Sequence, residues 1–289
     1  MKEQETITKP TAPGWAERKI ASWAELQEAI DPLAEQCLFR GQGSQAWPLI
    51  SSFNRLVPCM DETMALQGEL NAILNFRSQA HLYLPPTVIP PNPFKLAVLD
   101  TYIEWLMIMQ HYGAPTRLLD WSQSPYVVIY FAVIECSAED AAVWYFESAA
   151  VFKKIAERYG KRPDEFIDYA DFQADEIRRP EAEPLLYTAV KKFRTAREIA
   201  QQGVFTLSNR LSADQQDVIA QGCAGHNFGR MIIPHELKAE FATCSLEIMS
   251  SRIPLRLFRR TLWLFVPSRR EVLPLPTAFV RRRICARLR

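Results

Sequence analysis

The segment Gln110–Ala132, QHYGAPTRLLDWSQSPYVVIYFA, constrains the fold most, because it joins two apolar segments through a turn dense in polar groups. Apolar residues at helical spacing over 96–107 predict a helix before it. Gly113 and Pro115 predict the end of that helix. The chain must therefore place a polar turn between two elements that are themselves expected to be buried.

The second half of this segment, SPYVVIYFA, is compatible with two structures. Its β-branched run is typical of a strand. Ser124 in the N-cap position and Pro125 in the first helical position favour a buried helix instead. We adopt the helix, since both residues are in the positions that a helix start requires.

Apolar patterning predicts further elements on both sides of this segment. They do not alternate regularly as strand and helix, which indicates an α+β fold rather than a parallel α/β sheet. The predicted elements are helices over 15–30, 61–80 and 235–250 and strands over 37–41, 141–147 and 203–207.

Charge and composition suggest three parts. Residues 1–14 are a polar, flexible lead, 15–251 form the domain, and 252–289 are an arginine-rich tail with eleven Arg and one acid, Glu271. With a net charge of +1 for the whole chain, the tail is near +10 and the remainder near −9. The tail is either a contact for an anionic partner or a solvated segment.

Cysteine spacing and hydropathy argue against several classes of protein. The six cysteines include no close pair, which argues against a zinc cage and a disulfide scaffold. The longest apolar run, Tyr126–Ile134, is far below the roughly 20 residues of a membrane span. No hydrophobic leader is visible. We therefore expect a cytoplasmic protein with no membrane contact and no metal.

Three segments combine arginine, hydroxyl or amide side chains and aromatic rings with glycine: 38–42, 111–124 and 196–207. None contains a phosphate-binding loop, a dinucleotide fingerprint or a hydrolase motif. Arginine offers a permanent fork for phosphate or carboxylate, and glycine lets the backbone approach a ligand. The combination indicates a cleft for an anion carrying a ring.

These segments resemble the FRG domain family, named for its Phe/Tyr-Arg-Gly motif. The resemblance rests on Phe39-Arg40-Gly41, on the 110–132 block, and on Arg197 with Gln201–Phe205, and it spans about residues 20–250. The domain over 15–251 is accordingly identified as FRG-like.

A second, more distant resemblance is to arginine-class mono-ADP-ribosyltransferases. LFRG resembles their Tyr-Arg-Gly strand, and DWSQSPYVVIYFA is similar to their Ser-Thr-Ser strand and following helix. The resemblance implies a compact mixed domain with a small split β-sheet flanked by helices. It also implies NAD as cofactor and transfer of ADP-ribose to a macromolecule, protein or nucleic acid, in a toxin–antitoxin, effector or phage–host conflict system.

The resemblance also implies roles for individual residues. Arg40 would grip the NAD pyrophosphate or ribose, and Gln201, Gln202 or Glu198 would hold the nicotinamide ribose as positive charge develops. His111 would be a base for the acceptor. The implied catalytic residues are Arg40, His111, Glu198, Gln201 and Gln202, and the implied cofactor-binding residues are Arg40, Gly41, Tyr112, Arg117, Asp120, Trp121, Ser122 and Ser124.

Structural interpretations remain open for most of these residues. Arg40 could pair with Asp120 in a buried bridge. Asp120 could instead hold Arg117, Trp121 could belong to the core, and the serines could be helix caps. The histidines His81, His226 and His235 are isolated in sequence, which is typical of packed or solvated side chains rather than metal ligands.

Two functions of different class follow. The third segment has no Glu-x-Glu or Gln-x-Glu, which favours a non-catalytic nucleotide- or RNA-binding module. The concentration of His, Arg, Asp and Gln in three segments favours an NAD-consuming transferase. A hydrolase using Cys or Ser with His111 ranks last, since no nucleophile motif accompanies it.

Overall fold

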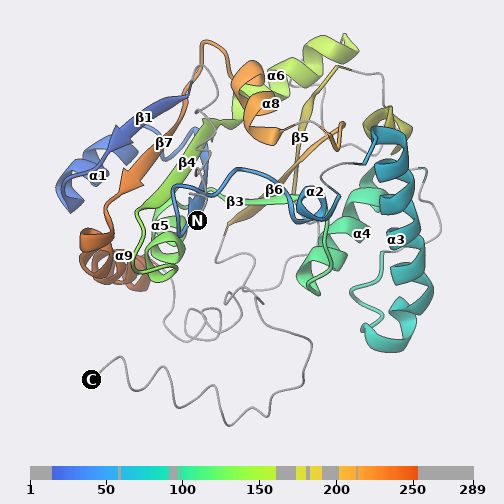
Figure 1. Ribbon diagram of the computed structural model, residues 1–289, viewed down its shortest axis with the longest axis horizontal. Coiled ribbons are helices and arrows are strands. Elements are labelled where there is room, and N and C mark those ends of the chain that lie inside the picture. The colour runs from blue at the N-terminus through green and yellow to red at the C-terminus, as the bar shows by residue number, and fades with distance from the viewer. Residues whose placement is uncertain are drawn as a thin grey trace, which may run out of the picture.

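A computed structural model describes residues 15–57, 60–90, 97, 99–160, 174–179, 183–190, 202–212 and 214–252. Its centre is a seven-stranded mixed sheet (Figure 1). In spatial order the strands are β1 (Ala16–Lys19), β7 (Phe228–Ile233), β4 (Ala141–Glu147), β2 (Cys37–Gln42), β3 (Leu119–Ser122), β6 (Gly203–Ser208) and β5 (Leu186–Ala189).

All neighbouring strands are antiparallel except β1 and β7, which run parallel. Helices flank the sheet, which confirms the α+β prediction, although seven strands are more than the small sheet expected. The helices are α1 (Trp23–Ile30), α2 (Ser52–Leu56), α3 (Glu62–Tyr83), α4 (Leu99–His111), α5 (Pro125–Ile134), α6 (Ser148–Tyr159), α8 (Gln215–Gly222) and α9 (Lys238–Arg252), with 3-10 turns η3 (Ala174–Arg178) and η4 (His235–Leu237).

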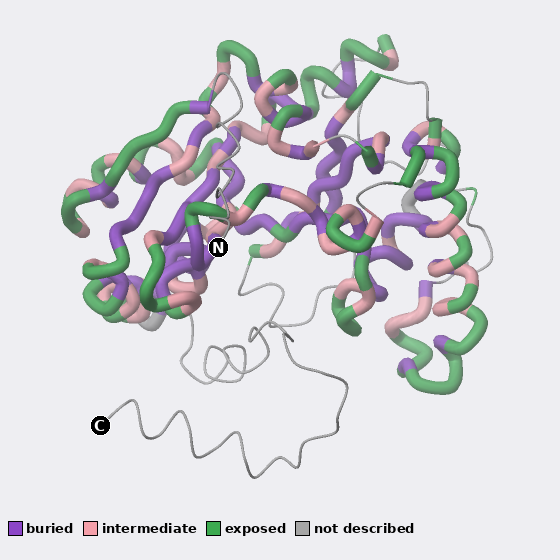
Figure 2. The backbone as a smooth tube through the Cα atoms, in the orientation of Figure 1, coloured by how far each residue is buried: buried purple, intermediate pink, exposed green. Residues whose placement is uncertain are grey.

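Two hydrophobic clusters fill the two faces of the sheet. On one face, α1, α5 and α9 pack against β2, β4 and β7 around Phe39, Val143 and Phe241. On the other, α4, α6 and α8 pack around Trp144 and Phe146. Because both faces are covered, the central strands are almost continuously buried, as Figure 2 shows in purple.

The helix predicted over 15–30 is wrong in its first third. Residues Ala16–Lys19 form β1, because they pair with Gly229–Ile232 of β7. The helix begins only at Trp23, where the Ser22 side chain accepts a hydrogen bond from the Glu25 backbone N–H as an N-cap. Long-range pairing thus overrides a local pattern that fits a helix.

The remaining predicted elements are confirmed, with shifted ends. Helices form at 62–83, 99–111, 125–134 and 238–252, and strands at 37–42, 141–147 and 203–208. Pro125 is in the first turn of α5 as expected. Residues 1–14 and 253–289, the predicted lead and almost all of the tail, lie outside the described residues. Every helix in the described part of the chain is too short or too polar to cross a bilayer.

The sheet is weakly connected at one point. β2 pairs with β4 over six residues and β3 with β6 over four, but β2 and β3 share a single pair, Phe39 with Ser122. Beyond that pair the two strands part. We call this place the ladder break, and it carries Arg40 on β2 and Asp120 on β3.

Candidate functional site

Arg40 spans the ladder break with its side chain. Its Nη1 donates a hydrogen bond of 2.7 Å to the backbone carbonyl oxygen of Asp120, taking the place of a strand-to-strand bond. Its Nε is buried and has no hydrogen-bond partner among the described residues. The predicted pairing with Asp120 therefore exists, but it runs to the main chain and leaves part of the guanidinium unused.

The Asp120 carboxylate is held from the other side by the end of α4. Gln110 Nε2 donates to Asp120 Oδ1 at 2.7 Å, and the Gln110 carbonyl accepts from the Thr116 hydroxyl. Asp120 keeps solvent-accessible surface, which leaves the ladder break open to a ligand from outside. Gln110 is the first residue of the 110–132 segment and was not among the residues predicted for the site.

Both charged groups at the ladder break are in an environment that disfavours charge. Desolvation by the surrounding protein atoms raises the pKa of Asp120, even though part of the residue is exposed. Arg40 and then Gln110 lower this pKa. Desolvation lowers the pKa of Arg40. Asp120 raises this pKa, and Arg55 lowers it further. Ionisable groups perturbed by burial and by a specific partner are typical of binding sites and active sites.

A pocket lies on the other side of the Phe39–Ser122 pair, beside the residues that precede β2 and follow β3. It is a pocket of about 560 Å³ at the N-terminus of α5, which we call the α5 pocket. Ser124, Gln123 and Gln202 line it on one side, and Glu35 and Gln36 line it on the other.

Gln202 is fixed in the α5 pocket by its backbone. It has a left-handed φ of 49°, and its carbonyl oxygen accepts a 3.1 Å hydrogen bond from the Gln123 N–H. Ser124 caps α5 without a side-chain cap bond, so its hydroxyl does not serve as the helix cap that was one interpretation. Two predicted residues, Ser124 and Gln202, therefore meet here, away from Arg40.

Arg117 lies in the core, with 1% of its surface exposed. Its Nε is 2.8 and 2.9 Å from the two carboxylate oxygens of Glu69, to which Nη2 also donates. Nη1 donates to the carbonyl oxygens of Ser208 and Ile177 at 3.0 and 3.2 Å. The Tyr102 hydroxyl adds a 2.6 Å bond to Glu69. Every guanidinium nitrogen of Arg117 thus bonds to a protein oxygen. Arg117 is not among the residues that line the α5 pocket, and it is buried in the core.

Trp121, Gly41 and Ser122 are also enclosed by protein. The Trp121 indole donates to the Thr206 hydroxyl at 2.8 Å and is buried. Gly41 faces α5 so closely that a Cβ there would be 2.2 Å from the carbonyl oxygen of Val128. The Ser122 hydroxyl accepts a 2.9 Å bond from the Ser124 N–H. These contacts of the three residues are all to other parts of the protein.

His111 and Tyr112 follow Gln110 at the end of α4 and are exposed, with their rings edge to face at 5.2 Å. They are therefore near in sequence to the residue that holds Asp120. Glu198 and Gln201 lie outside the described residues.

Comparison with known families identifies part of the chain. The family model of the FRG domain matches residues 35–141, so this part of the chain is similar to FRG domains. The match includes Arg40, Gln110 and Asp120 and ends at the first residue of β4, short of the 20–250 expected from the motifs. No curated protein and no solved structure matches the chain significantly.

Proposed function

We propose that this FRG-domain chain binds a pyrophosphate-containing nucleotide at the ladder break through Arg40, and that the ligand is NAD. The proposed reaction is transfer of ADP-ribose from NAD to a macromolecule. In that reaction the bond between nicotinamide and ribose C1′ breaks and a bond from C1′ to an acceptor nucleophile forms, with loss of the nucleophile's proton.

The observation that carries the proposal is the unused Nε of Arg40. Leaving a buried donor without an acceptor costs about 1–3 kcal/mol, so such groups in native folds call for an explanation. Nη1 already holds the chain at Asp120, which fixes the guanidinium in place. A phosphate oxygen that reached Nε would satisfy it with a charge-assisted bond, and because Nε is buried this contact requires the side chains around Arg40 to move.

The α5 pocket supports the assignment to NAD over a simple phosphate. Gln123, Gln202 and Ser124, which carry side-chain amides and a hydroxyl, are among its lining residues. These groups match the donors and acceptors of a carboxamide such as that of nicotinamide. Catalysis would rest mainly on positioning and electrostatic stabilisation.

Equilibrium binding of NAD to the purified chain tests the proposal, with nicotinamide release and transfer of labelled ADP-ribose as the readouts of turnover. We expect Arg40→Lys to weaken NAD binding about 10- to 100-fold, because lysine keeps the charge but loses the fork. Arg18→Lys is the matched control, since Arg18 pairs with Glu25 on the surface and lies on β1, which β7 and β4 separate from β2.

Three results are decisive. Unchanged NAD affinity in a folded Arg40→Lys variant would contradict the assignment of the site. No affinity for NAD, ADP-ribose or ATP would contradict the ligand class. Arg40-dependent binding without nicotinamide release, with any lysate or RNA as acceptor, would leave the alternative of a non-catalytic nucleotide- or RNA-binding module in place of the transferase.

A further inference from the structure

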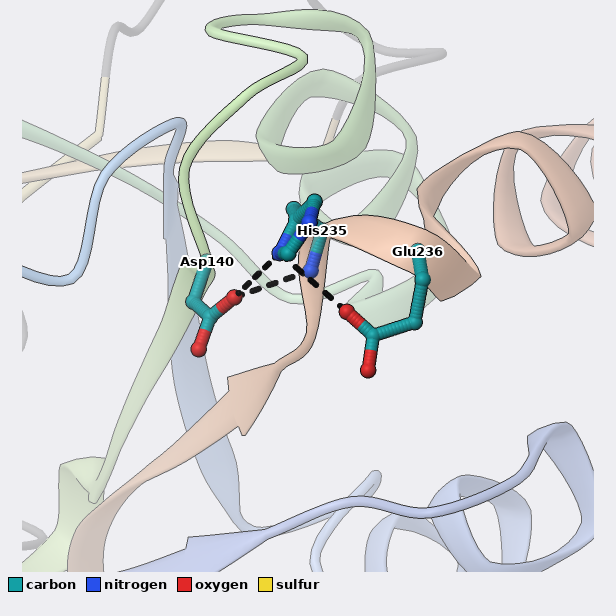
Figure 3. A group of neighbouring side chains, drawn as sticks. All are labelled: Asp140, His235 and Glu236. Carbon is teal, nitrogen blue, oxygen red and sulfur yellow. Dashed lines mark hydrogen bonds and ion pairs between the residues drawn. The ribbon is translucent and has the colours of Figure 1, made fainter.

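Three side chains of the types that bind metals lie together where β4 begins and β7 ends: Asp140, His235 and Glu236 (Figure 3). His235 Nδ1 lies 3.1 Å from Asp140 Oδ1 and 3.1 Å from Glu236 Oε2. All three ligand atoms are within 4.8 Å of one another. The proposed nucleotide site uses none of them.

The sheet brings these residues together. Asp140 immediately precedes β4, and His235 follows Pro234 at the end of β7, where Ala141 pairs with Ile233. The backbone N–H of His235 donates to Asp140 Oδ1 at 2.9 Å, and the Asp140 carbonyl accepts from the Gln45 N–H at 2.7 Å. The Asp140 carboxylate is therefore held by one main-chain bond, from His235, and the Asp140 backbone is held by another, from Gln45.

We propose that Asp140, His235 and Glu236 bind a divalent transition-metal cation, Zn²⁺, with at least one coordination position left to solvent. One imidazole nitrogen and two carboxylate oxygens are ligands that Zn²⁺ accepts, and three protein ligands are the number found where a fourth position stays open. The imidazole argues against Mg²⁺ and Ca²⁺, which prefer oxygen alone.

The spacing of the donors fits this ion. Two ligands of a tetrahedral Zn²⁺ at roughly 2.0–2.1 Å from the metal are about 3.3 Å apart. The two separations of 3.1 Å from His235 Nδ1 are close to that value, and the third, between the Asp140 and Glu236 carboxylates, is within 4.8 Å and adjusts on binding. Glu236 is the most exposed of the three, which lets its carboxylate adjust to the ion.

Two nearby lysines, Lys19 and Lys238, repel a cation at this site, which allows a second test of metal binding. Lys19 is close enough to act on the Asp140 carboxylate. Lys238 also acts on it, but its Nζ is fixed by the carbonyl oxygens of Gly43, Glu135 and Cys136. Lys19 is exposed, so Lys19→Gln removes repulsion without disturbing the core, and we expect it to tighten metal binding.

Titration calorimetry of the full, tag-free chain with Zn²⁺, with Co²⁺ spectra as a second readout, tests the proposal. We expect one Zn²⁺ per chain at this site, and affinity at least about tenfold weaker in His235→Ala and Asp140→Asn. The matched control is His226→Ala. His226 Nδ1 also contacts a carboxylate, Glu147 Oε1 at 3.2 Å, but belongs to no three-ligand group among the described residues.

Co²⁺ spectra separate this site from the cysteines, because thiolate ligands give intense charge-transfer bands and nitrogen–oxygen sites do not. Zn²⁺ binding that survives His235→Ala, or Co²⁺ bands of thiolate type, would overturn the assignment. So would the absence of binding to folded wild-type protein at millimolar Zn²⁺. Circular dichroism of each variant confirms that a lost signal does not reflect unfolding.

Discussion

Arg117→Met is expected to destabilise the fold by about 3–5 kcal/mol, because it leaves the Glu69 carboxylate buried without its cation. Arg117 and Glu69 each expose 2% of their side chains, so water cannot replace the lost partner. The same change also removes donors from the carbonyls of Ser208 and Ile177. Urea denaturation of the variant measures the free energy of unfolding.

The double variant Arg117→Met with Glu69→Leu provides the sharper comparison. We expect it to recover much of the lost stability, because no uncompensated buried charge remains. The exposed pair Lys154–Glu157 is the control, and removing Lys154 should change stability by no more than about 1 kcal/mol. A cost below about 1 kcal/mol for Arg117→Met would contradict the core role and return Arg117 to the candidate ligand contacts.

Gly41→Ala is expected to lower stability by about 3 kcal/mol or more, with β2 and α5 forced apart. The added Cβ would meet the Val128 carbonyl oxygen at 2.2 Å and the Ala132 Cβ at 3.0 Å. The first of these is backbone in a helix and cannot rotate away. Strand-on-helix packing is therefore sufficient to explain the glycine at position 41.

Gly68→Ala in α3 is the matched control for Gly41→Ala. A Cβ at Gly68 has nothing within 4 Å, and alanine is the better helix former by up to about 1 kcal/mol, so this variant should be slightly more stable. Denaturation midpoints of the two variants measure the contrast. Equal stability of Gly41→Ala and wild type would mean that β2 and α5 separate at little cost.

The sequence predicted those elements whose signals are local. The start of α5 is set by Pro125 in its first turn, and β2, β4 and β6 are dense in apolar residues that suit a sheet covered on both faces. β1 was missed because its four residues, AERK, are all exposed. They become a strand only through pairing with β7, which lies more than two hundred residues away.

The candidate site was predictable only in part, for the same reason. A pair between Arg40 and Asp120 was one interpretation of the sequence, and in the structure Arg40 Nη1 donates to the Asp120 carbonyl oxygen. The sequence did not indicate that Glu69, 48 residues from Arg117, is the partner of that arginine in the core. Nor could it show that Asp140 and His235, 95 residues apart, would meet, since each is isolated in its own segment.

The single Phe39–Ser122 pair has a mechanical consequence. A sheet resists bending across its strands through its ladder of hydrogen bonds, and here that ladder is reduced to one backbone pair assisted by one side-chain bond from Arg40. The four strands β1, β7, β4 and β2 and the three strands β3, β6 and β5 are therefore joined mainly through side chains, such as Trp121 of β3 packed edge to face on Phe146 of β4 at 4.7 Å. Arg40 adds a side-chain hydrogen bond beside the Phe39–Ser122 pair, so the cohesion of the sheet at this point depends on hydrophobic packing more than on its ladder.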